Sequence, residues 1–254
     1  MLKNERDKEI LHQLIQDGEV TVEQLAERFK TSHATIRREL RYLEKAGLLR
    51  RTHGGAIQVE PMLYEPFRRF SSFRAQDEMQ AAEKRRIGLA AAEMIKDGEI
   101  VALSAGTTTT QVGRSIHDRK DVTIVTNAIN IAMELSHRVD LKIVMTGGLL
   151  NKNCFALTGS LGIASVNEMF YDRAFISVDG IHPEHGLTAD SLELGAINRA
   201  IIQQSRKTVV VADHSKFGKV CKTLIAPVAN VDLIITDNSA PRHLPGDSPK
   251  VVCV

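Results

Sequence analysis

The sequence predicts a protein of two unlike domains: a small helical domain ending in a β-hairpin, then a larger α/β domain built on a mostly parallel sheet. Three observations predict this. Short amphipathic helical stretches occupy the first 45 residues and lead into a Gly-Gly turn. Seven Val/Ile-rich runs then alternate with turns and helical stretches. The length of 254 residues and the hydrophobic content of 43% suit one large domain or two unequal ones.

Two short helices are predicted at the start of the chain. Apolar residues at helical spacing cover about residues 4–17, and Gly18 stops this helix. Thr21 suits the N-cap of a second helix, because Gln24 follows three residues later and completes a capping box. Each helix therefore has one face to bury.

A third helix is predicted after Ser32, whose hydroxyl suits an N-cap. One apolar stripe runs along it at i, i+4 and i+7: Ile36, Leu40 and Leu43. Gly47 suits its C-terminal end. The stretch LLRRTHGGA then predicts a hairpin in which Gly54 and Gly55 supply a permissive backbone. Three helices followed by a basic hairpin form the winged type of helix-turn-helix.

The outer face of this third helix is small, polar and basic. Residues 1–56 hold 11 Lys/Arg against 9 Asp/Glu, whereas the remainder holds 22 of each, so the whole positive excess lies here. A merely solvated face is the alternative, but charge of one sign beside small residues favours entry into a DNA major groove. The predicted DNA-contacting residues are Ser32, His33, Thr35, Arg37, Arg38, Arg41, Arg50, Arg51 and His53.

Residues 58–76 are predicted to be a linker between a DNA-binding domain at 1–57 and a second domain at 77–254. Pro61 and Pro66 interrupt regular structure there. Phenylalanines recur at every third position from Phe67 to Phe73. They predict a short packed helix that serves either as a docking face between domains or as a dimer contact.

The second domain is predicted to begin with a long helix from Asp77 to Asp97-Gly98. Near-continuous Val/Ile runs follow, and they predict strands buried on both faces of a parallel sheet. The runs cover residues 99–104, 122–127, 141–146, 173–179, 207–213, 231–237 and 250–254.

Small, polar and glycine residues follow these strands at their carboxyl ends, where ligands gather in such sheets. Gly106, Thr107 and Thr108 precede a helix start, which suits a phosphate group. The other candidates are Asn127, Gly147, Gly148, Asp179, Glu193 and Lys216. Each alone could be a turn or a helix cap, but their recurrence at successive strand ends predicts a pocket for a phosphorylated small molecule.

Other features exclude several classes of protein. Cys154, Cys221 and Cys253 show no CxxC spacing and no even pairing, which predicts reduced core thiols rather than disulfides or a metal site. The charged start predicts no signal peptide, and no apolar run approaches the roughly 20 residues of a membrane span. We expect a cytoplasmic protein with no membrane partner, metal or cofactor.

The stretch from Val20 to Ala56 resembles the DNA-binding domain of the DeoR family of bacterial sugar-metabolism regulators. Its matching residues are Ser32, Thr35-Ile36-Arg37-Arg38-Glu39-Leu40, Leu43-Glu44, Gly47 and His53-Gly54-Gly55-Ala56. Glu39 stands where the family usually has Asp. The second half matches the family's effector domain at Gly106-Thr107-Thr108, Thr126-Asn127, Gly147-Gly148, Asp179-Gly180 and Asp213-His214-Ser215-Lys216-Phe217.

The resemblance implies an effector domain similar in fold to ribose-phosphate isomerases and CoA-transferase-like domains. It adds Ser104 to the effector site, at a position where the family usually has an acidic residue. It implies a non-enzymatic regulator, a repressor of a carbohydrate-utilisation operon that acts as a homodimer or homotetramer. A phosphorylated sugar or polyol would release it from double-stranded operator DNA. The alternative is a sugar-phosphate isomerase with an accessory DNA-binding domain, because Asp179, Glu193 and Lys216 could supply charged groups.

Overall fold

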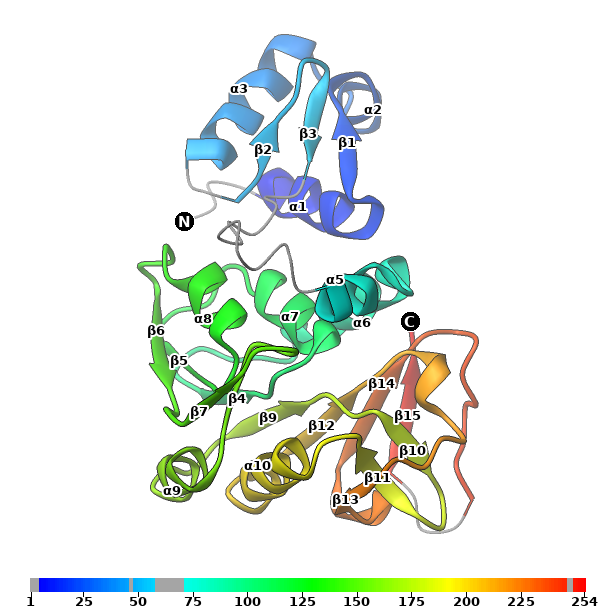
Figure 1. The fold of residues 1–254 in the computed structure, drawn as a ribbon. Coiled ribbons are helices and arrows are strands. Elements are labelled where there is room, and N and C mark those ends of the chain that lie inside the picture. The colour runs from blue at the N-terminus through cyan, green and yellow to red at the C-terminus, as the bar shows by residue number, and fades with distance from the viewer. Residues whose placement is uncertain (1–4, 46–47, 58–70, 246–248) are drawn as a thin grey trace. The chain divides into compact units, whose positions relative to one another are not determined.

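The computed structural model describes residues 5–45, 48–57, 71–245 and 249–254 (Figure 1). The chain divides into two units, Met1–Met62 and Leu63–Val254. Most of the predicted linker, with Phe67 and Phe70, lies outside the described residues. Its last part is helical and belongs to the second unit, as the start of α5 (Ser71–Glu78). The domain bounds 1–57, 58–76 and 77–254 remain a prediction.

The described part of the first unit is a winged helix, as predicted. Its elements are α1 (Glu5–Asp17), β1 (Glu19–Thr21), α2 (Val22–Arg28), α3 (His33–Lys45), β2 (Arg50–Arg51) and β3 (Gly55–Ile57). The strands form an antiparallel sheet in the order β1-β3-β2 (Figure 1). The predicted capping box of Thr21 and Gln24 is present at the start of α2. The apolar faces of the helices share one core with the sheet, which includes Leu14, Leu25 and Leu40.

In the Gly-Gly turn of the hairpin, Gly55 is required by a close approach and not by its backbone torsion. Neither Gly54 nor Gly55 has a positive φ, which corrects the expectation of a permissive backbone. A Cβ on Gly55 would lie 1.9 Å from the carbonyl oxygen of Val20. Strands β1 and β3 pair at this point, so any side chain at Gly55 would force them apart.

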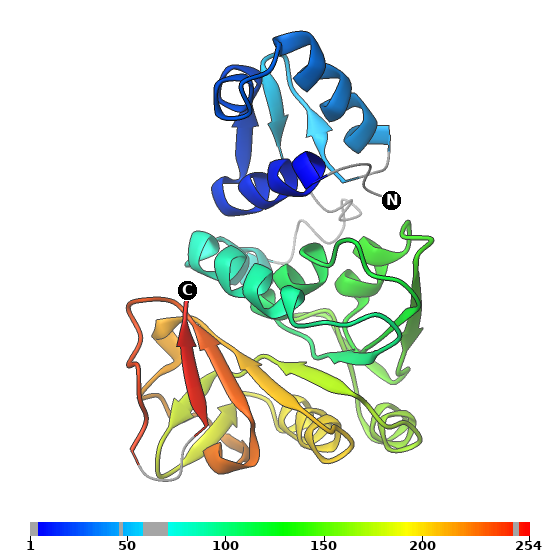
Figure 2. The same ribbon diagram turned by 180° about the vertical axis from the view of Figure 1, so that it is seen from behind.

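The second unit is built on a seven-stranded parallel sheet in the order β15-β14-β12-β9-β4-β5-β6. Every one of the seven predicted runs is a strand of this sheet. They are β4 (Ile100–Leu103), β5 (Val122–Thr126), β6 (Leu141–Met145), β9 (Arg173–Ile176), β12 (Thr208–Val211), β14 (Leu233–Thr236) and β15 (Lys250–Cys253). Strand β15 forms one edge and carries the C-terminus, as Figure 2 shows from behind.

Helices cover both faces of this sheet, which explains why its strands lack polar alternation. The helices are α6 (Ala81–Glu93), α7 (Thr107–Arg114), α8 (Ile129–Leu135), α9 (Ser160–Asn167) and α10 (Leu192–Gln203). Helices α6, α7 and α8 pack on one face, where Leu103 of β4 is buried. Helices α9 and α10 pack on the other, where the neighbouring Ala102 is buried (Figure 1). Successive residues of one strand therefore enter different cores.

The predicted long helix from Asp77 is wrong in one respect, because it is two helices. Helix α5 ends at Glu78, and Gln80 has φ of 53°, in the left-handed region. Helix α6 then begins at Ala81 and carries the predicted buried residues Ile87 and Ala91. A single left-handed residue reverses the chain, and apolar spacing alone does not reveal it.

Two small antiparallel sheets were not predicted. Strand β7 (Leu149–Asn151) pairs with β8 (Ala156–Thr158). A second sheet joins β10 (Gly180–His182), β11 (Gly186–Ala189) and β13 (Thr223–Ala226). Each of these strands has only three or four residues, too few to show a clear alternation.

The sheet has a topological switch point beside β4. The chain moves from β4 through β5 to β6 at one edge, and then resumes at β9 on the other side of β4. In open sheets of this kind a crevice forms outside the carboxyl ends of the strands where the order reverses. The ends of β4 and β9 therefore define the place for a ligand.

His117 follows α7 and is half-buried, with both ring nitrogens shielded from solvent. Neither ring nitrogen has a hydrogen-bond partner among the described residues. Burial and the nearby Arg138 guanidinium lower the pKa of His117 to about 4, although Asp118 and Asp140 act in the opposite direction. The folded chain thus keeps this ring neutral at neutral pH.

We expect the second unit to lose stability as the pH falls from 6.5 to about 4. In this window the unfolded chain binds a proton at His117 that the folded chain excludes, so the free energy of unfolding decreases as the pH falls. A shift of this size corresponds to on the order of 3 kcal/mol. In His117→Phe, the free energy of unfolding of the second unit should depend less on pH. Urea titrations of the second unit's unfolding transition at several pH values measure this. An equally steep dependence in the variant would contradict this account.

Candidate DNA-reading surface and effector site

Helix α3 presents the face that the sequence predicts for DNA. Ser32 caps it, since its hydroxyl oxygen accepts a hydrogen bond from the backbone N–H of Thr35 at 3.2 Å. The two hydroxyls of Ser32 and Thr35 also lie 3.0 Å apart. Ile36, Leu40 and Leu43 are buried, so the opposite side of the helix faces solvent. Gly47, predicted to end the helix, lies outside the described residues.

The predicted DNA-contacting side chains are exposed, except for the half-buried Thr35. The exposed ones are Ser32, His33, Arg37, Arg38, Arg41, Arg50, Arg51 and His53. Within the described residues, the side chains of Arg37, Arg38 and Arg50 make no hydrogen bond or ion pair. An arginine without an internal partner keeps its forked donors for a guanine edge or a phosphate.

Arg51 differs from these arginines because it is tied to α3. Its Nε donates to Glu44 Oε2 at 2.7 Å, and its backbone N–H donates to Glu44 Oε1 at 3.0 Å. These bonds lower the pKa of the Glu44 carboxyl. Arg51 thus fastens the hairpin to the helix, which limits the predicted contact with the DNA backbone to its remaining guanidinium nitrogens.

Glu39, the departure from the family motif, lies on the inner side of α3. Its carboxylate oxygens each accept from Arg6 Nε at 3.0 Å, which joins α3 to α1. Glu39 is buried, so it does not lie on the exposed face of α3. Its bonds to Arg6 set the position of this helix instead.

Replacing Ser32 by alanine should lower the stability of the first unit by about 1 kcal/mol, because the free N–H of Thr35 loses its acceptor. Ser32→Asn keeps a cap of similar strength and should restore stability in thermal unfolding. If Ser32→Asn binds operator as weakly as Ser32→Ala, the hydroxyl itself contacts DNA. Equal stability of all three proteins would refute the capping role.

At the switch point, the loops after β4 and β9 touch. A Cβ on Gly106 would lie 2.3 Å from Ser177 Cβ and 2.4 Å from its Oγ. Gly106 is therefore required where the two strand ends meet. Ser177, which follows β9, is a site neighbour that sequence analysis missed, because only the sheet order places it beside Gly106.

The four threonines that follow Gly106 divide into two pairs. Thr109 and Thr110 both donate their hydroxyls to the carbonyl oxygen of Gly106, at 2.9 and 2.7 Å. Thr107 and Thr108 make no hydrogen bond through their hydroxyls to any described residue, and no side chain caps the start of α7. Helix starts leave backbone N–H groups free and carry partial positive charge. The first pair of hydroxyls and these N–H groups form a candidate anion site.

Ser104 and Asn127, both predicted to contact the effector, are fully buried and already hydrogen-bonded. Ser104 Oγ accepts from the Ser177 backbone N–H at 3.0 Å. Asn127 Oδ1 accepts from the Ala105 N–H at 2.9 Å, and its Nδ2 donates to the Leu157 carbonyl at 3.1 Å. Both residues hold the loop in shape, and their contact with an effector stays a prediction.

Gly147 and Gly148 follow β6 and shape the β7–β8 hairpin. Both have positive φ, 69° and 121°. A Cβ on Gly148 would lie 2.5 Å from the carbonyl oxygen of Thr158 in β8. The positive φ of both glycines, and the close approach of Gly148 to β8, account for them without a ligand.

The charged candidates are less uniform. Asp179 is half-buried after β9, and its Oδ2 accepts from the Asp190 N–H at 2.9 Å. Glu193 is exposed on α10 and accepts from the Ser191 hydroxyl at 2.6 Å, which holds the pKa of Glu193 below its usual value. Lys216 is half-buried in the short 3₁₀ helix η1 (His214–Lys216) after β12.

Lys84 on α6 is a charged neighbour of this region that sequence analysis missed. It is only 4% exposed, and burial lowers its pKa. The charges acting on it include Asp213, which is buried at the start of η1, and Lys216. A signal was present, because Lys84 shares the apolar stripe of α6 with Ile87 and Ala91. A lysine on a buried stripe is unusual unless it is paired.

A winged helix with an exposed basic face and a sheet with a candidate anion site at its switch point are typical of one class of protein. This class comprises regulators that read DNA with one domain and sense a small molecule with another. The chain belongs to the DeoR family. The family model for the DeoR C terminal sensor domain matches residues 79–238, and that for the DeoR-like helix-turn-helix domain matches residues 6–61. The protein is thus a DNA-binding transcriptional regulator.

Curated relatives match along almost their whole length. The HTH-type transcriptional regulator GolR of Listeria innocua is 30% identical, over 96% of this chain and 94% of its own. The HTH-type transcriptional repressor GlcR of Bacillus subtilis is 36% identical, over 93% and 89%. A putative aga operon transcriptional repressor of Escherichia coli O157:H7 is 31% identical, over 94% and 87%.

Among solved structures, ribose 5-phosphate isomerase A of Methanocaldococcus jannaschii is similar with a TM-score of 0.41 and 17% identity. The match covers 54% of this chain and 55% of that one, and it carries no argument about activity.

Across the described residues, no helix has the length and hydropathy of a membrane span. The three cysteines, Cys154, Cys221 and Cys253, are free thiols. They were predicted to lie in the core, but all three are half-buried.

Proposed function

We propose that the protein represses a carbohydrate-utilisation operon and leaves its operator when a phosphorylated sugar or polyol binds the second unit. The observation that carries this proposal is the contrast among the four threonines of α7. Two hydroxyls are used internally, and two stand unbonded at an uncapped helix start beside the switch point. A dianionic phosphate is the natural occupant of such a site. The relatives named as repressors support the sign of regulation.

On DNA, we propose that α3 enters the major groove and the hairpin lies on the phosphate backbone. His33, Thr35, Arg37 and Arg38 lie in the first turns of α3, the part of a recognition helix that meets base edges. Arg50, Arg51 and His53 supply the backbone contacts. Their exposure supports this assignment.

In the effector site, we propose that the phosphate binds Gly106, Thr107 and Thr108. The sugar hydroxyls then face Asp179, whose Oδ1 has no hydrogen bond to a described residue, and the Lys216 ammonium group. Asn127 and Ser104 act indirectly by holding the loop. Gly147, Gly148 and Glu193 have structural explanations, and we assign them no contact.

We propose a non-enzymatic role, and the charged groups disfavour the isomerase alternative. An isomerase needs a base with a pKa near the working pH, close to the substrate's acidic carbon. The lowered pKa of Glu193 makes this exposed carboxylate a weaker base. Asp179 already accepts the Asp190 N–H through one oxygen, which leaves only its other oxygen for a substrate.

We further propose a homodimer or homotetramer assembled through the second unit, acting in the cytoplasm. A single winged helix offers a small contact area, which symmetric regulators double on repeated half-sites. Phe73 is not available for this contact because it is buried within its own unit. Light scattering should give a mass of two or four chains, and a monomer both with and without DNA would refute the assembly.

The proposed function is tested with an operator obtained by selection from a random duplex library. Pentose, hexose and hexitol phosphates are screened for a raised melting midpoint, since a ligand of the folded state stabilises it. A stabilising phosphate should also release the operator in a gel-shift titration, whereas its unphosphorylated parent sugar should do neither. The proposal fails if no DNA sequence is enriched, or if no sugar phosphate has both effects.

A further inference from the structure

Helix α5 is the first described element that follows the DNA-binding unit along the chain. It is held to the second unit at few points. Of its side chains from Phe73 onward, only Phe73 is buried, and its ring lies edge-on to Phe155 with centroids 5.0 Å apart. A segment with so little buried surface has low local stability and can detach at little cost.

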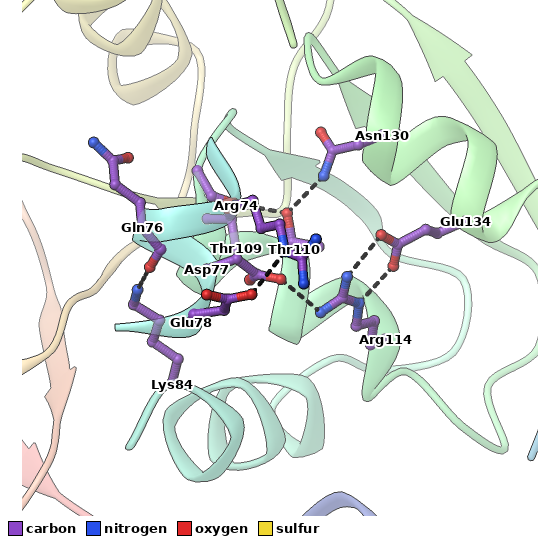
Figure 3. Close-up of polar contacts among 11 residues, drawn as sticks. Arg74, Gln76, Asp77, Glu78, Lys84, Thr109, Thr110, Arg114, Asn130 and Glu134 are labelled. Carbon is purple, nitrogen blue, oxygen red and sulfur yellow. Dashed lines mark hydrogen bonds and ion pairs between the residues drawn. The ribbon is translucent and has the colours of Figure 1, made fainter. Parts of the chain in front are cut away.

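Two side-chain contacts join α7 to α8. The first lies near the candidate phosphate loop, residues 106–108, and the second lies near the C-terminal ends of both helices. Asn130 Nδ2 donates to Thr110 Oγ1 at 2.9 Å, and Thr110 in turn donates to the Gly106 carbonyl. One helical turn further on, Arg114 donates to both carboxylate oxygens of Glu134, at 2.7 and 3.0 Å. Figure 3 shows these two contacts side by side across the two helices. These contacts lie along the path from the loop to Arg114.

Arg114 also reaches α5 through Asp77. Its Nη1 lies 3.6 Å from Asp77 Oδ2, a longer contact than either bond to Glu134 (Figure 3). The other oxygen, Asp77 Oδ1, is buried and has no hydrogen-bond partner among the described residues. If Asp77 moves away, Glu134 still pairs Arg114, so no buried cation is left alone. The Asp77 contact can therefore break while the rest of the network stays intact.

A second contact reaches α5 from the other side of the site. Lys84 Nζ donates to the carbonyl oxygen of Gln76, next to Asp77. Asp213 and Lys216 at the end of β12 are among the charges that act on Lys84. The end of α5 thus contacts both Arg114 and Lys84, and Lys84 feels the charges of the loop after β12.

We propose that α5 transmits effector occupancy to the DNA-binding unit, and that Asp77–Arg114 is the contact that changes. This rests on the proposed phosphate site at Gly106, Thr107 and Thr108. A phosphate drawn onto the start of α7 displaces a helix of only eight residues, and Arg114 is its last residue. The altered Asp77 contact then changes the docking of α5, the first described element after the DNA-binding unit.

The test uses full-length Asp77→Asn, the selected operator, and the sugar phosphate that stabilises the wild type most. In the wild type this ligand should change the operator Kd by roughly 5- to 150-fold. In Asp77→Asn the change should fall below about twofold, while the ligand's stabilising effect persists. Glu78→Gln is the matched control, because Glu78 is exposed and pairs with Arg74 of the same helix. It should respond like the wild type.

The outcomes separate this inference from the proposed function. If the wild type responds to no sugar phosphate, the proposed function fails. If Asp77→Asn binds ligand and still responds fully, the role of α5 is overturned. Should the variant not fold or not bind operator, amide hydrogen exchange of the wild type decides. Protection over Phe73–Glu78 must change on adding the ligand, and unchanged protection overturns the inference.

Discussion

Replacing Arg37 and Arg38 together by alanine should weaken operator binding by about 2 kcal/mol or more, at least roughly thirtyfold. Both guanidinium groups are exposed on α3 and make no bond to a described residue. Stability should stay within about 0.5 kcal/mol of the wild type, because no internal contact is lost. A gel-shift titration at several salt concentrations measures the effect, and loss of phosphate contacts would also reduce the salt slope.

The matched control removes two exposed arginines from the second unit, as Arg206→Ala with Arg242→Ala. It changes net charge equally and should leave operator affinity close to that of the wild type. If this control weakens binding as much as the α3 double variant does, the loss reflects net charge and not a reading surface. Unchanged affinity in Arg37→Ala with Arg38→Ala would show that α3 does not face DNA.

The double variant Thr107→Ala with Thr108→Ala should bind operator normally but no longer be released by the sugar phosphate. A response of roughly 5- to 150-fold in operator affinity should be lost. The reason is that these hydroxyls have no described internal partner, so their removal affects the ligand and not the loop. Operator titration with and without the ligand, and the ligand's effect on the melting midpoint, measure the change.

Serine keeps the hydroxyl, so Thr107→Ser with Thr108→Ser is the control and should retain most of the response. Thr109 and Thr110 offer a contrast, because both hydroxyls bond the Gly106 carbonyl. Alanine at these positions should destabilise the second unit itself. A normal response in the Thr107/Thr108 alanine variant would remove the phosphate from this loop.

Patterns that are local in sequence predicted most of the fold. Helical apolar spacing located α1, α2 and α3, and the Thr21 capping box is present as predicted. Continuous Val/Ile runs located all seven strands of the parallel sheet, because strands covered on both faces need no polar alternation. The break at Gln80 and the short strands were missed, since one torsion or three residues leave no periodic signal.

The candidate site was predicted less completely than the fold. The sequence placed Gly106, Thr107 and Thr108 before a helix start, but Thr107 and Thr108 are the first two residues of α7. Their hydroxyls make no hydrogen bond to a described residue, which leaves the candidate site in place. It also suggested Ser104 and Asn127, which are turned inward. The residue types at a strand end indicate which groups lie near a site. They do not indicate which of these groups are already hydrogen-bonded within the protein.

By itself, the sequence determined the winged helix, the parallel sheet, the family and the polar loop after β4. Each depends on residues within a few positions of one another. Only the tertiary structure decided which polar groups stay free. Ser104 finds its partner 73 residues away, Asn127 accepts from an N–H 22 residues away, and Arg114 pairs with Glu134 20 residues away. Partners so distant leave no periodic trace, because burial and hydrogen bonding are settled only when the strands assemble.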